Sequence, residues 1–482
     1  MMYDAKRLHP ITILIQTGKN MKRYIFSILP FIFIKHSGKD GIIFGVIALF
    51  LLFSVVFLTS LFSWLKKTYR MEDGELRIEY GVFVRKKRYI PIERIQSLNL
   101  SEGILQQLLG LVKVQVETAG GGNGEEAEIV LSAITKMEAK ALQTFVESTK
   151  YSSHEEVEPV KEKVPVYKIA TSELLLLSLT SGGIGVVISA VLALISQLDD
   201  VIPYKKLFGR FEHWAENSII TVAFLVFIGL LLAWVIALAR TMLKFANFTV
   251  IKSGDDIIIS QGLLEKRQLT IPIKRIQAIR IKENMIRQIL GFATVYIESA
   301  GGSSANIESS KVMFLPAVRL KKIAEIVGPN LSEFHLTQKF HPAPKKALAR
   351  YLIRSWYIPI PVVIAAVIFL NAWGLLTFIL LGIMSVFAVR KYQSAGWNID
   401  SEQLSLRFGG MVRTTVYMKK NKIQSLEIRE SYFQRRKNLG TIEAIVKSGT
   451  GPSGGAVVDL EKEDVKQIYN WYSREKNEGL HM

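Results

Sequence analysis

The sequence predicts a membrane protein of α-helical hairpins that also carries three β-rich domains, each a β-sandwich or barrel with a C-terminal helix. Three observations predict this class. Uncharged apolar segments are long enough to cross a bilayer, the segments between them alternate polar and apolar residues, and part of the chain repeats. The 482 residues are 49% hydrophobic yet 21% charged, which favours spans separated by soluble domains.

The composition excludes several chemistries. The chain has no cysteine, so disulfides, thiolate metal sites and cysteine nucleophiles are absent. The net charge of +19 fits either a nucleic-acid binder or a membrane protein with a large cytoplasmic face. The charge sits at the ends of the apolar runs and in the soluble domains, without a long Lys/Arg tract. We therefore favour the membrane interpretation and expect no nucleic-acid partner.

The apolar runs indicate six spans in three hairpins, because a spanning helix needs about 20 mostly apolar residues. The weakest run holds Pro30 and is short, so a re-entrant or interfacial helix is the alternative there. Basic residues flank the runs on the side of the soluble domains, which predicts cytoplasmic N- and C-termini. The predicted spans cover residues 22–37, 41–64, 172–198, 217–239, 355–373 and 374–390.

The spans divide the chain into alternating membrane and soluble parts. The acidic, proline-containing stretch before residue 165 has the composition of a linker. We expect a first segment with its hairpin (1–65), a first domain (66–150), a linker (151–165), a second hairpin (166–245), a second domain (246–330), a third hairpin (331–391) and a third domain (392–482).

The soluble domains are copies of one another. Residues 75–121 align without gaps on residues 256–302, and more than a third of the aligned positions are identical. A third, more diverged copy begins near Trp397, with Lys422 and Gln424 in the Arg-Ile-Gln place. In this copy we expect Leu439 and Gly440 to correspond to Leu109 and Gly110, after two extra residues. The repeated positions are Gly81, Pro91, Arg94, Gln96 and Gly110; Gly262, Pro272, Arg275, Gln277 and Gly291; and Gly409, Lys422, Gln424 and Gly440.

Each copy reads as strands followed by a helix. Period-2 alternation over residues 76–80 predicts a half-buried strand, and residues 82–84 are expected to begin the return strand. Thr135 and Glu138 form a predicted capping box at the start of the closing helix. In the second copy, Pro316 is expected at the start of that helix.

The paired spans, the His-Pro dipeptides before the first and third hairpins, and the pattern G-[VL]-[FL]…I-P-I-x-R-I-Q…L-G resemble the bacterial pleckstrin-homology-like (PH-like) membrane proteins. In particular they resemble the YdbT-type members with several such domains. The resemblance implies a PH-like fold for each copy, a location in the bacterial plasma membrane and pairing with a smaller one-domain homologue. It also suggests a role in envelope stress or antimicrobial resistance.

Two groups of polar residues are candidates for contacts. The repeated Arg-Ile-Gln step is interpreted as structural, with the isoleucine in the core, while a headgroup or partner contact is the alternative. Basic clusters at the predicted β-hairpin tips either contact the lipid bilayer or a partner, or protect strand edges from pairing. The membrane- or partner-contact candidates are Arg85, Lys86, Lys87, Arg88, Lys266, Arg267, Arg413, Lys419 and Lys420.

No pattern for catalysis or for a cofactor stands out. The glycine runs are not followed by Gly-Lys-Ser/Thr, and the seven histidines lack metal-ligand spacing. We therefore expect neither an enzyme nor a metal or cofactor site. The sequence predicts a membrane scaffold or adaptor that assembles or regulates membrane-protein partners, with a component of a lipid or peptide export system as the alternative.

Overall fold

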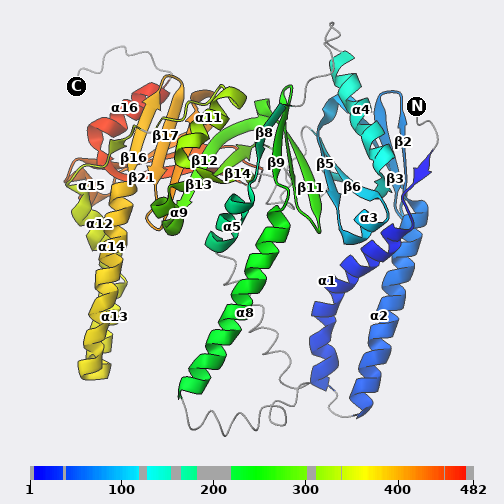
Figure 1. The fold of residues 1–482 in the computed structure, drawn as a ribbon, viewed down its shortest axis with the longest axis horizontal. Helices are drawn as coiled ribbons and strands as arrows, with labels where there is room; N and C mark the ends of the chain where they lie inside the picture. Colours follow the sequence, from blue (N-terminus) through cyan, green and yellow to red (C-terminus); the bar gives the residue numbers. More distant parts are fainter. Residues whose placement is uncertain are drawn as a thin grey trace. The chain divides into compact units, whose positions relative to one another are not determined.

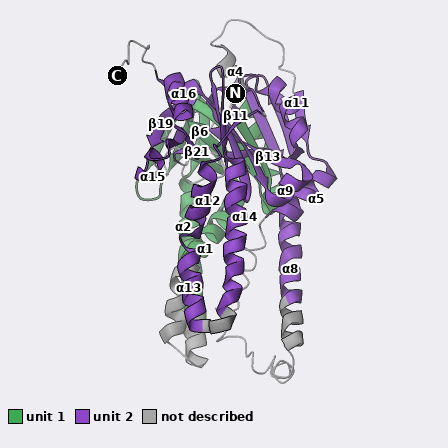
Figure 2. Ribbon diagram, turned by 90° about the vertical axis from the view of Figure 1, so that its left-hand side faces the viewer, with its two compact units in different colours: residues 1–161, 264–270 green, residues 162–263, 271–482 purple. Residues whose placement is uncertain are grey.

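The computed structural model describes residues 5–35, 39–118, 128–152, 164–181, 219–300, 311–337, 339–449 and 451–473. The glycine-rich segments after residues 118 and 300 and most of the predicted span 172–198 lie outside these ranges. The chain divides into two units (Figure 2). Unit 1 comprises residues 1–161 and 264–270, and unit 2 comprises residues 162–263 and 271–482.

Three helices are long and apolar enough to cross a membrane, within the described part of the chain. They cover Val46–Lys66, Phe227–Phe245 and Gly374–Ser394. A fourth candidate is a pair of helices bent by 43°, α12 (Ala347–Trp356) and α13 (Pro359–Leu370). The other helices of the hairpins are α1 (Ile11–Lys35), α2 (Lys39–Lys66), α5 (Thr171–Thr180), α8 (Ile219–Phe245) and α14 (Phe378–Ser394), with the 3-10 turn η4 (Asn371–Thr377) before α14.

The first domain, in unit 1, is built from two antiparallel sheets and a closing helix (Figure 1). Leu76, Val114 and Leu142 belong to one core of buried side chains between the sheets and the helix. The first sheet holds β1 (Lys6–Arg7), β2 (Thr68–Glu72), β3 (Glu75–Tyr80) and β4 (Lys86–Pro91). The second holds β5 (Ile95–Glu102), β6 (Leu111–Thr118) and β7 (Glu128–Thr135), with α3 (Ile104–Leu108) after β5 and α4 (Lys136–Ser152) at the end.

The second domain repeats this order. Its first strands are β8 (Val164–Lys168), β9 (Thr249–Ser253), β10 (Asp256–Gln261) and β11 (Lys266–Pro272). They are followed by β12 (Ile276–Asn284), α9 (Met285–Leu290), β13 (Phe292–Ser299), β14 (Lys311–Arg319) and α11 (Leu320–Asn330).

The third domain has the same elements. They are β15 (His341–Pro342), β16 (Gly396–Asp400), β17 (Gln403–Phe408), β18 (Val412–Lys419), β19 (Ile423–Arg429), α15 (Tyr432–Arg435), β20 (Leu439–Val446), β21 (Ser453–Glu461) and α16 (Lys462–Tyr472). Short 3-10 turns follow β4, β11 and β18: η1 (Ile92–Arg94), η3 (Ile273–Arg275) and η5 (Lys420–Lys422). The predicted combination of membrane helices and three β-rich domains is confirmed.

Each hairpin interrupts the domain that follows it. Lys6 and Arg7 pair with Tyr69 and Thr68, and His341 and Pro342 pair with Trp397 and Gly396, so a strand before the hairpin joins the first strand after it. Sequence reasoning missed this, because strands of two residues have no periodicity to detect. Its only signal was the repeated His-Pro dipeptide.

Of three local predictions, one agrees with the structure and two do not. The capping box is confirmed, since the Thr135 N–H donates to Glu138 Oε2 at 3.1 Å and the Glu138 N–H donates to Thr135 Oγ1 at 3.2 Å. Pro316 does not start a helix: it lies inside β14, at a register shift between β13 and β14, where a bulge tolerates a residue without an N–H. Residues 82–84 form a turn, and the return strand β4 begins only at Lys86.

The two extra residues expected in the third copy are absent. Gly110 and Gly291, which precede β6 and β13, have φ angles of 64° and 69°, and Asn438, which precedes β20, has a φ angle of 51°. Asn438 therefore takes the place that was assigned to Gly440. Asparagine tolerates the left-handed region better than other non-glycine residues. The third copy therefore keeps the left-handed backbone conformation at this position without a glycine.

Candidate functional site

The second and third domains share one sheet in unit 2. Strand β12 of the second domain pairs antiparallel with β18 of the third, from Ala278 opposite Met418 to Asn284 opposite Val412. The resulting seven-stranded sheet runs β14-β13-β12-β18-β17-β16-β15. We call this pairing the second joint. Glu283 and Arg413 lie opposite one another in it and form an ion pair with two hydrogen bonds.

Residues of β11 make the same contact with β5 in unit 1. Lys266 lies opposite Glu102, and Gln268 lies opposite Leu100. In the repeat alignment Glu102 is equivalent to Glu283, and Lys266 is equivalent to Arg413. This pairing, the first joint, therefore has the same register as the second joint, with an acidic residue facing a basic one in both.

A buried carboxylate supports each joint from the neighbouring strand. In the first domain, Glu117 accepts hydrogen bonds at 2.8 Å from both Ser97 and Asn99, and the Asn99 side-chain oxygen accepts one from the Thr270 N–H. In the second domain, fully buried Glu298 pairs with Arg280. These side chains link each domain to a strand or loop of the next one.

Arg280 completes its contacts in the third domain. Its guanidinium donates to the backbone oxygen of Gly454 at 2.6 Å and to Ser453 Oγ at 3.3 Å. Losing one partner of such a buried pair is costly, because the other charge stays buried without compensation. The second joint is thus held by a backbone ladder and by hydrogen bonds from a buried arginine that is charge-paired within its own domain.

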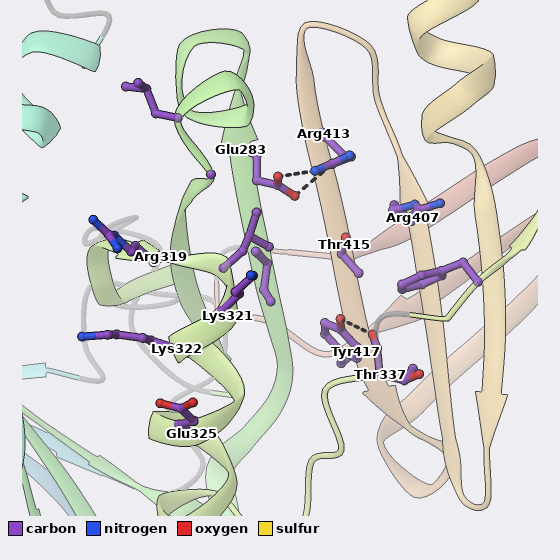
Figure 3. Close-up of a pocket in the computed structure, with 15 residues that line it drawn as sticks. Glu283, Arg319, Lys321, Lys322, Glu325, Thr337, Arg407, Arg413, Thr415 and Tyr417 are labelled. Carbon is purple, nitrogen blue, oxygen red and sulfur yellow. Dashed lines mark hydrogen bonds and ion pairs between the residues drawn. The ribbon is translucent and has the colours of Figure 1, made fainter.

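A pocket of about 790 Å³ lies at the second joint (Figure 3). Arg319, Lys321 and Lys322 line one side of it, and Arg407 and Arg413 line the other. The charge balance of the lining is positive, so the pocket has the chemistry to accept an anionic group.

Several groups of this pocket already have partners. Arg413 is held by Glu283, and the Arg407 guanidinium lies 4.5 Å from the Phe340 ring centroid. The Tyr417 hydroxyl donates to the Thr337 oxygen at 3.0 Å. Burial raises the pKa of Tyr417 and lowers the pKa of Arg407. Arg319, Lys321 and Lys322 are the exposed cations of the lining.

One end of each domain faces its helical hairpin (Figure 1). Helix α2 ends at Lys66 and β2 begins at Thr68, so the start of β2 lies next to the hairpin. Because β3 and β4 run antiparallel to their neighbours, the turn after β3 returns to this end, and so does the end of β5 with α3. The same strand order places α9 and α15 at the corresponding ends of their domains.

This end exposes apolar side chains in all three domains. Phe83 at the turn after β3 is 99% exposed, and Leu108 of α3, Ile289 of α9 and Tyr432 of α15 are 78%, 83% and 67% exposed. Water disfavours such exposure, whereas the interfacial region of a bilayer accommodates apolar and aromatic groups. The residues at this end, here called the membrane-facing end, are Val82, Phe83, Val84, Ile104, Leu105, Leu108, Leu109, Leu263, Leu264, Met285, Ile286, Ile289, Leu290, Met411, Val412, Tyr432 and Phe433.

The predicted contact residues occupy different places. Arg85 directly precedes β4 beside the exposed turn and pairs with Glu79, and Lys86, Lys87 and Arg88 are the first residues of β4. Lys266, Arg267 and Arg413 lie at the equivalent places of β11 and β18, inside the two joints. Lys419 and Lys420 do not lie at a hairpin tip: they end β18 and begin η5, at the opposite end of the strand.

Several of the repeated signature residues contact the backbone or form turns. Arg275 donates to the Ala300 oxygen at 3.0 Å, and Gln277 donates to the Arg275 oxygen at 3.0 Å, while Lys422 donates to the Lys274 oxygen at 3.2 Å. Gly81 has a φ angle of 110°, and a Cβ there would lie 2.0 Å from the Val84 oxygen, so only glycine fits. These contacts pin the chain at the strand ends.

Buried polar side chains attach the hairpins to the domains. In the second domain Arg287 of α9 donates to Thr180 Oγ1 of α5 at 2.7 Å. In the third domain fully buried Asp459 accepts hydrogen bonds at 2.9 Å from Arg350 and Arg354 of α12. Sequence reasoning found none of these residues, since their spacing along the chain carries no periodic signal. In the described part of the chain, no three His, Asp or Glu residues cluster in a way that could hold a metal ion.

The comparisons with known proteins agree with this architecture. The family model of the Bacterial PH domain matches three times, at residues 24–150, 186–330 and 359–476. The chain belongs to the bacterial PH domain family. It is also 42% identical to the UPF0699 transmembrane protein YdbT of Bacillus subtilis (strain 168), over 99% of this chain and 100% of the relative. The predicted resemblance is confirmed, and each family match covers the PH domain together with part of the hairpin before it.

Proposed function

We propose that this PH-domain protein is a non-enzymatic, multi-pass scaffold of the bacterial plasma membrane, which assembles or regulates membrane-protein partners. The observation that carries the proposal is the second joint, in which two PH domains, each attached to its own hairpin, form one continuous sheet. Such a sheet holds two hairpins at a fixed spacing and displays strand edges and domain ends for docking. Both termini are cytoplasmic in this proposal, because basic residues flank the spans on the domain side.

The membrane-facing end supports the same proposal. Inserting a side chain such as Phe83 among lipid headgroups and acyl chains removes apolar surface from water, at about 1.5–3 kcal/mol for full burial. Neighbouring basic residues such as Lys86 and Lys87 would lie at the level of anionic headgroups. Because the spans already tether each domain, weak lipid contacts suffice to orient it on the bilayer.

Partner capture tests the scaffold proposal directly. The detergent-solubilised protein is isolated by affinity from its native membrane, and the co-purified proteins and lipids are identified by mass spectrometry. A stoichiometric membrane-protein partner, for example a one-domain PH-like homologue, is the expected result. A defined lipid or peptide without a protein partner would contradict the proposal and favour an export component instead.

An environment-sensitive dye tests the membrane contact. The chain has no cysteine, so Phe83→Cys and Asp73→Cys each provide one labelling site. Asp73 lies at the turn between β2 and β3, away from the membrane-facing end, and its side chain is 72% exposed. In nanodiscs the dye at position 83 is expected to emit at shorter wavelength than the dye at position 73. Equal emission at both positions would contradict bilayer contact at this turn.

Sensitivity to membrane-active compounds tests the physiological extension of the proposal. If the scaffold serves envelope stress or antimicrobial resistance, cells that lack the protein become more sensitive to such compounds, and the wild-type chain restores resistance. Unchanged sensitivity would remove this extension without affecting the scaffold proposal itself.

A further inference from the structure

Two strands lie at open sheet edges, whereas the equivalent strands of the other domains pair with a neighbouring strand. In the described residues β19 ends the sheet β19-β20-β21, and β4 ends the sheet β1-β2-β3-β4. The equivalents of β19 are β5 and β12, which pair with β11 and β18 at the two joints. The equivalents of β4 are β11 and β18 themselves. Among the described residues, β19 is therefore an open edge of the β5 and β12 type, and β4 is an open edge of the β11 and β18 type.

The exposed fractions follow this difference. Ile428 of β19 is 38% exposed, while its equivalent in β12, Ile281, is 5% exposed. Tyr89 of β4 is 52% exposed, while its equivalent in β18, Tyr417, is 4% exposed. An edge strand with unpaired backbone groups is a template for pairing with another strand.

The charges on the two edges are complementary. In the repeat, Glu430 is equivalent to Glu102 and Glu283, and Arg85 is equivalent to Lys266 and Arg413. The acidic member lies opposite the basic member at both joints. The register of the joints, applied to β19 and β4, therefore places Glu430 opposite Arg85.

We propose that β19 of one molecule pairs antiparallel with β4 of a second copy, in the register of the two joints. This proposal deepens the proposed scaffold function, because it names one of the partners. Glu430 then faces Arg85, and Ile428 faces Lys87. The Glu430 end of β19 and the Arg85 end of β4 both lie at the membrane-facing ends of their domains, so the pairing keeps both molecules in the same orientation on one bilayer. The contact is head-to-tail, and its repetition gives a closed ring or an open row.

One neighbouring pair carries like charges. Lys86 would lie opposite Arg429, but Arg429 already forms ion pairs with Glu427 and Glu443. This group of three has a net charge of minus one, so it attracts Lys86 rather than repelling it.

The new contact also differs from the joints in one respect. The positions of Arg280 and Glu298 are taken by Glu427 and Ile445, so β19 lacks the buried charge pair of the second joint. At the second joint Arg280 donates to Gly454 of the next domain, and on an edge that opens and closes such a buried donor would lose its acceptor whenever the edge is open. The third contact is therefore reversible, whereas the joints are permanent.

Cysteine crosslinking in isolated membranes tests the proposal. Two chains with tags of different length are co-expressed, one with Lys87→Cys and the other with Ile428→Cys. Mild oxidation is expected to give a dimer that contains both tags, because opposed cross-strand residues lie close enough for a disulfide. A link between two differently tagged chains cannot form within one molecule.

Matched controls make the outcome decisive. Leu100→Cys with Gln268→Cys in one chain places the same pair of positions at the first joint, and it should form an internal disulfide. If this control closes and no mixed dimer forms, the proposal is overturned. Dimers of Ile428→Cys alone, in equal yield, would show β19 pairing with itself and overturn it as well.

A charge swap tests the register. Glu430→Lys in the chain with Ile428→Cys should lower the yield of the mixed dimer about two- to fivefold, as expected for an exposed ion pair. Arg85→Glu in the chain with Lys87→Cys should restore it. If the swap does not restore the yield, the register is wrong. Partner capture remains informative in either case, since it detects other membrane proteins independently of this contact.

Discussion

The second and third PH domains have equivalent strands, but they differ in whether the edge of one of these strands is paired. Strand β12 is closed by β18, and behind it lies the buried pair of Arg280 and Glu298. Strand β19 is open among the described residues, and Glu427 and Ile445 stand at the corresponding positions. The difference indicates that buried polar groups are used only where the partner strand belongs to the same chain. There the third domain is always present, so the hydrogen bonds from buried Arg280 to Gly454 and Ser453 are always made.

The largest effect is expected from breaking the buried pair of the closed edge. Arg280→Ala leaves Glu298 buried without its partner and should destabilise the second joint by about 3–5 kcal/mol. Glu427→Ala, at the same position of the open edge, should leave stability nearly unchanged, because this side chain is exposed. Pulse proteolysis of the two variants measures both effects. Similar losses of stability in the two variants would mean that the paired and open edges do not differ in how much their polar side chains stabilise the protein.

A smaller effect is expected where the two domains attach their hairpins. Asp459 stands two residues before the end of β21, and Ala317 stands at the same place in β14. Asp459→Asn removes the charge that holds Arg350 and Arg354, and asparagine suits the φ angle of 60° there. The third domain should lose about 1.5–3 kcal/mol, the range for hydrogen bonds to a charged group. Thermal unfolding followed by proteolysis measures the loss, and an unchanged profile would show that Asp459 does not anchor α12.

The smallest effect concerns the turn before β20. Asn438→Ala places a residue with Cβ and no local hydrogen-bonding group in the left-handed region, and should cost about 1 kcal/mol. Asn438→Gly should be neutral or slightly stabilising. Gly440→Ala serves as the comparison, because that residue has no positive φ angle and its Cβ would meet only side-chain atoms, the nearest being Val465 Cγ2 at 3.2 Å. A larger loss from Gly440→Ala than from Asn438→Ala would contradict the structural alignment of the third copy.

The repeat, the membrane helices and the β-rich domains could be predicted from the sequence by itself, because each depends on periodicity or on local preference. Runs of apolar residues, the alternation around Leu76 and Ile78, and the capping box of Thr135 and Glu138 are such local signals. They extend over a few neighbouring residues, so a single chain of letters displays them.

The joints, the strands that precede the hairpins and the open edges were decided by the tertiary structure. They depend on which strand edges meet, and residues such as Arg280 and Gly454 come together from positions far apart in the chain. Alternation tells which face of a strand is buried but not which edge is paired, because backbone hydrogen bonds do not depend on the side chain. The equivalence of Glu102, Glu283 and Glu430 was readable from the repeat, yet its meaning appeared only when two of them were found opposite a basic residue of the next domain.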